Sequence, residues 1–101
     1  MIAISITSKR KNSLLDLRFG RSPHFCLYNG EDFRFIDNPF HEEENDVAPR
    51  VVKMLKDKKV NKVITGEVGP KAKDALEKSK IQLIMLDEDH INLQEIIKKL
   101  S

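Results

Sequence analysis

The sequence is poor in the residues that mark special classes of protein. Its 101 residues include no Trp, one Cys, four Gly and four Pro. So little Gly and Pro argues against a collagen-like or disordered chain, and a lone cysteine, Cys26, cannot form an internal disulfide. No apolar run reaches the roughly 20 residues of a membrane span, and the first residues lack the basic leader of a signal peptide. We therefore expect a protein of the reducing cytoplasm without a membrane partner.

The sequence also has no large excess of either positive or negative residues. Lys and Arg number 18 against 16 Asp and Glu, which leaves a formal net charge of +2, and the two signs are mixed through most of the chain. Nucleic-acid binding needs a concentrated basic surface, so we expect no nucleic-acid partner. With 40% hydrophobic residues and the length of one domain, residues 1–101 are expected to fold as a single domain.

Apolar patterns predict five strands. β-branched residues at every second position predict a central strand over 2–7. Runs rich in Phe, Leu, Tyr and Ile predict strands over 24–29 and 32–37, joined by turn residues as an antiparallel hairpin. Two further strands are expected over 62–65 and 81–86. The sequence shows no internal repeat.

Local signals predict where three helices begin. Asp46 is a candidate cap for the first, and acidic residues at 42–44 lie just before it, where the positive end of a helix dipole favours them. Pro70 opens the second helix. Asn92 caps the third, with Glu95 completing a capping box. The order β-β-β-α-β-α-β-α predicts an α/β fold with a mixed five-stranded sheet and three helices packed on it.

Residues 8–22 form a long segment without a helix or strand pattern. Fifteen such residues are uncommon in a compact domain unless they bind something. The guanidinium groups of Arg18 and Arg21 could chelate an anionic ligand, and Gly20 between them lets the backbone come close to it. The alternative is that both arginines are solvated and Phe19 only fills the core.

The strand-to-helix turn at 66–71, Gly-Glu-Val-Gly-Pro-Lys, is a second candidate site. Near Gly69 the first N–H groups of a helix and the positive end of its dipole would face solvent beside Lys71. A turn after a parallel strand is also where ligands collect in an open sheet. The turn lacks the Gly-Lys-Ser/Thr of a P-loop, so no nucleotide is implied. The alternative is that glycine only permits a tight turn.

Soft metal ligands are few. His24 and Cys26 lie two apart on an expected strand, so both side chains share a face and could ligate copper, iron or zinc. His41, in the acidic loop, could add a ligand. The alternatives for Cys26 are a small buried hydrophobe or a thiol nucleophile beside His24. The strand over 2–7 has no carboxylate, which excludes a magnesium-dependent nuclease.

Three motifs together suggest a family. The runs Arg-Phe-Gly-Arg-Ser-Pro-His-Phe at 18–25, Asn-Pro at 38–39 and Gly-Glu-Val-Gly-Pro-Lys-Ala at 66–72 resemble the dinitrogenase iron-molybdenum cofactor biosynthesis domain family in order and spacing. The resemblance covers nearly the whole chain. It implies a ribonuclease H-like fold and a small stand-alone protein of archaea or anaerobic bacteria. It also implies non-catalytic binding or carriage of an iron-molybdenum-type or related metal–sulfur cluster.

The resemblance also implies a site and its partners. Arg18 stands where family members commonly have a histidine. The cofactor-binding set is then Arg18, Gly20, Arg21, Gly69 and Lys71, with His24, Cys26 and His41 as metal-ligand candidates. A cluster donor or acceptor protein is the expected partner, and a monomer or weak homodimer the expected state. The alternative is a regulatory or adaptor module that binds a small anion or a partner protein at the same loops without metal.

Overall fold

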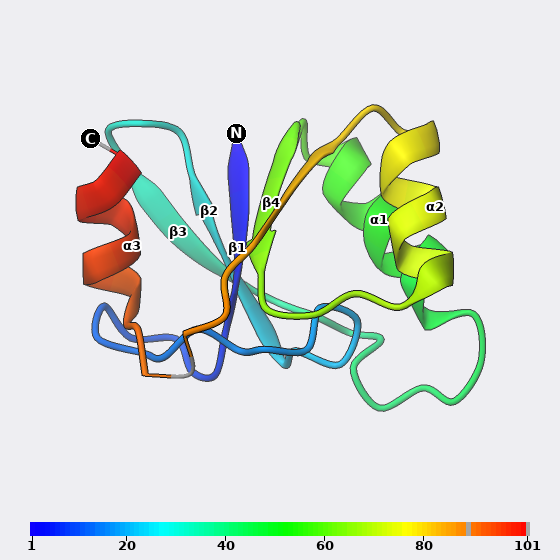
Figure 1. The fold of residues 1–101 in the computed structure, drawn as a ribbon, viewed down its shortest axis with the longest axis horizontal. Helices are drawn as coiled ribbons and strands as arrows, with labels where there is room; N and C mark the ends of the chain where they lie inside the picture. Colours follow the sequence, from blue (N-terminus) through cyan, green and yellow to red (C-terminus); the bar gives the residue numbers. More distant parts are fainter. Residues whose placement is uncertain (89, 101) are drawn as a thin grey trace.

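The structure, a computed structural model, describes residues 1–88 and 90–100. Five strands and three helices follow one another in the predicted order (Figure 1). The expected α/β class is confirmed, and the likeness to ribonuclease H stays a prediction. The elements are β1 (Ile2–Ile6), β2 (His24–Tyr28), β3 (Phe33–Asp37), α1 (Val47–Asp57), β4 (Lys62–Thr65), α2 (Pro70–Lys78), β5 (Gln82–Met85) and α3 (Leu93–Leu100).

The five strands form one mixed sheet in the order β3-β2-β1-β4-β5. β1 lies at its centre, antiparallel to β2 and parallel to β4, and β5 continues the parallel part. β2 and β3 pair as the predicted antiparallel hairpin. The carboxyl ends of β1, β4 and β5 therefore meet at one rim of the sheet.

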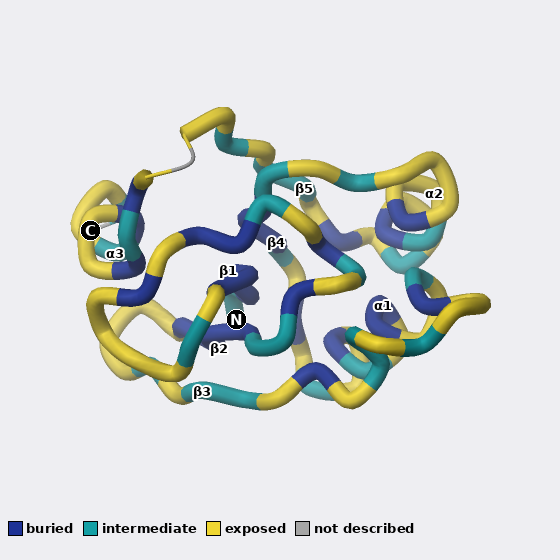
Figure 2. The backbone as a smooth tube through the Cα atoms, turned by 90° about the horizontal axis from the view of Figure 1, so that it is seen from below, coloured by how far each residue is buried: buried dark blue, intermediate teal, exposed yellow. Residues whose placement is uncertain are grey.

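Helices cover both faces of the sheet, α1 and α2 on one side and α3 on the other (Figure 1). The alternation along β1 explains this: Ala3 belongs to the core under α1 and α2, whereas Ile4 and Ile6 belong to the core under α3. All three side chains are fully buried, and β1 carries the colour of buried residues along most of its length in Figure 2. Burial of one such isoleucine contributes about 1.5–3 kcal/mol. Among the described residues, no helix has the length and apolarity needed to cross a bilayer.

The predicted helix starts are largely confirmed. Asp46 does precede α1, but it has a left-handed backbone with φ 55° and its side chain makes no capping hydrogen bond. Before α3, the backbone N–H of Glu95 donates to Asn92 Oδ1 at 2.9 Å, and the N–H of Asn92 donates to Glu95 Oε1 at 3.2 Å. The capping box therefore forms as the sequence predicts.

Helices α1 and α2 end in the same way, a likeness that sequence analysis missed. The N–H of Val60 donates to the carbonyl of Leu55 at 3.0 Å, and that of Ile81 to Leu76 at 2.9 Å. This is the Schellman arrangement, in which one residue takes a left-handed conformation. Here those residues are Lys59 (φ 69°) and Lys80 (φ 58°). We call the edge of the sheet that holds these two turns the far rim.

Candidate functional site

A hollow of about 670 Å³ lies at the rim where the parallel strands end. Three parts of the chain enclose it: the loop at 18–21, the first turn of α1, and the turn at 67–69 with the first turn of α2 that follows it. All five residues predicted to bind a cofactor line it. Its lining residues are Arg18, Phe19, Gly20, Arg21, Val47, Ala48, Glu67, Val68, Gly69, Pro70, Lys71 and Ala72.

The loop at 18–21 is fastened to the turn after β4. The N–H of Glu67 donates to the carbonyl of Leu17 at 2.6 Å, and the N–H of Phe19 donates to the carbonyl of Glu67 at 3.3 Å. Gly66 permits this pairing, because a Cβ atom there would lie 2.5 Å from the Cα of Leu17. Below it, the buried Ser5 hydroxyl donates to the Asp16 carbonyl at 2.6 Å. The long segment predicted without regular structure is therefore held in place by non-local bonds.

Phe19 supports the loop from inside. Its side chain is 2% exposed and meets the ring of Phe25 edge-on, with 5.8 Å between centroids. The expectation that Phe19 fills the core is thus met, yet the residue also lines the hollow. A core anchor at this position fixes where Arg18 and Arg21 on either side leave the backbone.

Arg18 is oriented by a buried carboxylate. Its Nε and one terminal nitrogen donate to the two oxygens of Asp16, each at 3.1 Å, and its backbone N–H donates to Asp16 Oδ1 at 2.9 Å. Asp16 is 3% exposed, whereas the Arg18 side chain is 64% exposed. The hydrogen bonds and charge of Asp16 raise the pKa of Arg18, so the guanidinium remains charged. One terminal nitrogen of Arg18 is left for a ligand.

Arg21 connects the hollow to the acidic loop before α1. It donates to the backbone carbonyl of Glu43, and the Glu43 carboxylate pairs with Arg50 of α1. The acidic residues 42–44 precede α1, as the sequence predicts, and none lies in its first turn. Glu43 instead binds Arg50, one turn into the helix, and this leaves the amino end of α1 open to the hollow.

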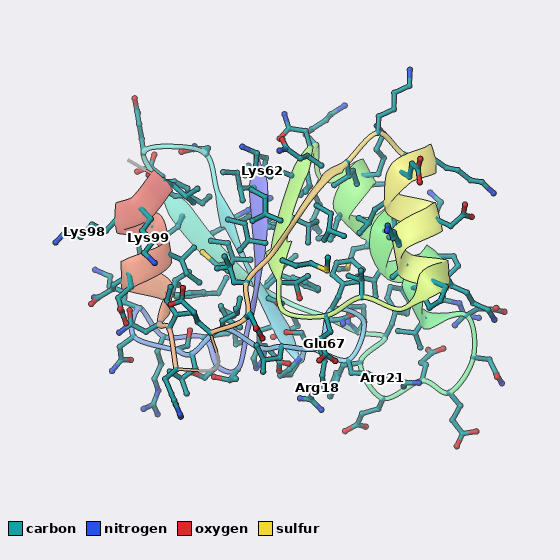
Figure 3. The ribbon with its side chains drawn as sticks, in the orientation of Figure 1. Arg18, Arg21, Lys62, Glu67, Lys98 and Lys99 are labelled. Atoms are coloured by element: carbon teal, nitrogen blue, oxygen red, sulfur yellow. The ribbon has the colours of Figure 1, made fainter. Side chains whose placement is uncertain are left out.

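The amino ends of two helices meet at this hollow. Val47 and Ala48 open α1, and Pro70 and Lys71 open α2 from the N-cap Gly69. Neither cap residue makes a side-chain hydrogen bond to its helix. The first N–H groups of a helix lack carbonyl partners within it and the dipole is positive there, so this geometry attracts an anion. Figure 3 shows Arg18 and Arg21 at this edge beside Glu67.

The predicted soft ligands lie outside the lining of the hollow. Nδ1 of His24 is 3.0 Å from Asp37 Oδ1, which also pairs with Lys9 at 3.0 Å. Lys9, and to a lesser degree His24, lower the pKa of Asp37. Cys26 is fully buried, and burial raises the pKa of its thiol to about 12. His41 is half-buried in the loop before α1. Among the described residues, no three His, Cys, Asp or Glu side chains are placed to hold a metal ion.

Sequence analysis missed the apolar part of the site. Val47, Ala48 and Ala72 line the hollow, and the sequence presents them as ordinary core positions at the starts of two helices. Val68, in the turn before α2, lines it as well. It also gave no role to Glu67, which lines the hollow and whose backbone pairs with that of Arg18 in a parallel bridge. The signal that points to them is the position of each residue within one turn of a helix start at the same sheet rim.

A family model described as dinitrogenase iron-molybdenum cofactor matches residues 1–101. The chain belongs to this family. That membership connects it with the biosynthesis or carriage of iron-molybdenum cofactor or a related metal cluster. A search of the curated proteins finds no relative by sequence.

Solved structures of family-like proteins share the fold. The apo form of the orange protein from Desulfovibrio gigas aligns with a TM-score of 0.89 at 22% sequence identity, over 98% of this chain and 84% of that one. A putative NifB protein from Thermotoga aligns with a TM-score of 0.82 at 25% identity, again over 98% and 84% of the two chains. These two proteins therefore share the arrangement of sheet and helices.

Proposed function

We propose that this protein holds and carries an anionic metal–sulfur cluster, of the iron-molybdenum type or a related type, in the hollow at the carboxyl ends of the parallel strands. It does so without chemical turnover. The observation that supports the proposal is the convergence of Arg18, Arg21 and Lys71 with the amino ends of α1 and α2 on one hollow. The family description, dinitrogenase iron-molybdenum cofactor, favours such a cargo.

The chemistry of the lining fits a polyanion held from its outside. Sulfide-rich clusters bear negative charge, and guanidinium, ammonium and free backbone N–H groups donate charge-assisted hydrogen bonds to such surfaces. The apolar wall strengthens these bonds by excluding water. Within the part of the chain that the structure describes, no Cys or His side chain lines the hollow. The proposed cargo is therefore bound by charge and hydrogen bonds rather than by thiolate or imidazole ligands.

Anaerobic reconstitution tests the proposal. The protein is incubated with iron, molybdate and sulfide, desalted, and examined by visible absorption and elemental analysis. We expect a coloured protein with a reproducible metal content. The double variant Arg21→Ala/Lys71→Ala is expected to bind about a hundredfold more weakly, because two charged hydrogen-bond donors are lost.

The matched control is the double variant Arg34→Ala/Lys98→Ala. It removes the same charge from exposed positions outside the hollow, and Lys98 lies on α3, away from Arg18 and Arg21 in Figure 3. We expect it to bind cargo like the wild type. A colourless, metal-free wild-type protein, or equal loss in both double variants, would contradict the proposal.

A second candidate is a regulatory or adaptor module that binds a small oxyanion at the same hollow. The absence of soft ligands from its lining favours this reading. Titration calorimetry with molybdate alone, without iron or sulfide, separates the two candidates. Tight binding of molybdate that survives in the triple variant His24→Ala/Cys26→Ser/His41→Ala, with no cluster formed on reconstitution, would support the adaptor and exclude the carrier.

A further inference from the structure

The far rim gathers positive charge that the proposed cargo does not use. The turns at 56–62 and 77–82 hold six lysines against two acidic residues, Asp57 and Glu77. These turns lie side by side, because β4 and β5 pair in parallel with Lys62 opposite Gln82. Figure 3 shows Lys62 at the edge opposite Arg18 and Arg21. The charge is therefore concentrated at the end of the molecule away from the hollow.

Few of these lysines have a partner within the described chain. Lys56 donates to the carbonyl of Ser79 at 2.8 Å, and Lys78 pairs with Asp74 at 3.0 Å. The remaining four ammonium groups make no hydrogen bond or ion pair to any described residue. These four lysines are Lys58, Lys59, Lys62 and Lys80. Of the two acidic residues, Asp57 is already paired with Lys53 at 3.0 Å.

Two of the four occupy positions that favour glycine. Lys59 and Lys80 have φ values of 69° and 58°, in equivalent turns after α1 and α2. A left-handed residue after a helix is most often glycine, because a Cβ atom is disfavoured in that conformation. Both turns nevertheless place a lysine there. A cation at the carboxyl end of a helix is favoured by the helix dipole, and the side chains of both lysines remain exposed to solvent.

A second hollow lies beside these lysines. Its volume is about 430 Å³, and Asn29, Asn61, Gln82, Lys62 and Tyr28 line it together with Met1, Ile2, Gly30 and Leu100. Asn29 Oδ1 already accepts from the N–H groups of Glu31 and Asp32, and Asn61 Oδ1 from the Met1 amino group. The amide NH₂ groups can still donate to the carbonyls of an extended peptide. Lysines suit carboxylate side chains. A lipid surface would instead call for exposed apolar anchors, and the two exposed large hydrophobics of the described chain, Leu14 and Met85, line neither hollow.

We infer that the far rim is a docking surface for an acidic peptide segment of a partner protein. The carboxylates of the peptide bind Lys59, Lys62 and Lys80, and the main chain of the peptide binds the amides of the second hollow. A partner docked there leaves the opposite rim uncovered. The inference does not depend on the nature of the cargo.

Titration of the isotope-labelled full chain with a hexaglutamate peptide, followed by NMR, tests the inference. We expect amide shifts confined to residues 58–62, 80–82 and the second hollow. The double variant Lys59→Gly/Lys80→Gly is expected to weaken binding about fivefold, as two exposed ion pairs would. Its melting temperature should be equal to or higher than that of the wild type, because glycine relieves the left-handed positions.

The charge-matched control is Arg34→Gln/Lys73→Gln, two exposed residues outside the far rim, and it should bind hexaglutamate within about twofold of the wild type. Shifts that map to Arg21 and Lys71, or equal weakening in the control, would overturn the inference. So would lysine-dependent binding to phosphatidylserine vesicles without binding to hexaglutamate, because that result would assign the far rim to a membrane surface.

Discussion

Gly66 lies where two segments distant in the sequence touch. A Cβ atom at this position would sit 2.5 Å from Leu17 Cα, which belongs to the backbone and cannot rotate away. We expect Gly66→Ala to lower the free energy of unfolding by about 1–3 kcal/mol, the range for overpacking, as measured by urea denaturation. Cargo binding should fall with it, because the loop of Arg18 and Arg21 is fastened at this contact.

Gly69 offers the control. A Cβ atom there would have no heavy atom within 4 Å, and serine is a better N-cap than glycine. Gly69→Ser should therefore leave stability unchanged or slightly higher. If Gly66→Ala proved as stable as Gly69→Ser, the close approach of the two segments would not be a constraint on the fold.

Cys26 is expected to be inert in the folded protein. Its side chain is fully buried between sheet and α3, and its thiol pKa is raised to about 12. Because only the thiolate reacts, iodoacetamide at pH 7 should alkylate Cys26 slowly in buffer and rapidly in 8 M urea. Mass spectrometry follows the reaction. Rapid alkylation of the native protein would instead support the alternative in which Cys26 is a thiol nucleophile.

At the scale of the element, the start of α3 tests how far a local signal determines structure. Asn92 and Glu95 exchange two hydrogen bonds there. We expect Asn92→Ala to destabilise the protein by about 1 kcal/mol, the usual loss for an N-cap, with amide exchange accelerated in α3. The exposed neighbour Gln94→Ala should change stability by less than about 0.5 kcal/mol. Equal effects of the two variants on stability would show that the capping box does not stabilise the start of α3.

Elements were predictable because their signals are local. Alternating β-branched residues, the Pro70 start and the Asn92 box each act over a few residues, and every predicted strand and helix exists, with ends shifted by about a residue. The long segment at 8–22 could not be resolved in the same way. Its conformation depends on bonds to Glu67 and to Ile91, partners more than forty residues away that no local pattern announces.

The charged residues of the site could be predicted from the sequence, whereas the apolar residues that line the hollow could not. Arg18, Arg21 and Lys71 were found because cationic groups beside glycine suggest an anion, and the structure brings all three to one hollow. Val47 and Val68 have no chemical signal of their own. Their part in the hollow follows only from the meeting of two helix starts, which is a property of the folded sheet.

At the scale of the whole molecule, the two rims should act independently. Four- to five-residue strands separate them by about 15 Å, more than the screening length of about 8 Å at 0.15 M salt. We expect reconstituted and cargo-free protein to bind hexaglutamate with Kd values within about twofold at that ionic strength. At 0.01 M salt, where screening extends to about 30 Å, the anionic cargo should weaken peptide binding. Strong coupling at 0.15 M would show that the rims communicate through the fold.

The central place of β1 has a consequence for synthesis on the ribosome. β1 is made first, yet one of its two edges is paired with β4, whose residues follow about sixty positions later. The β1–β2–β3 meander alone therefore has an open parallel edge and lacks α1 and α2 over its apolar face. Until the polypeptide past Thr65 clears the exit tunnel, this nascent intermediate exposes an unpaired strand edge and apolar surface, both of which favour aggregation. We expect the intermediate to depend on chaperones that the finished protein does not need.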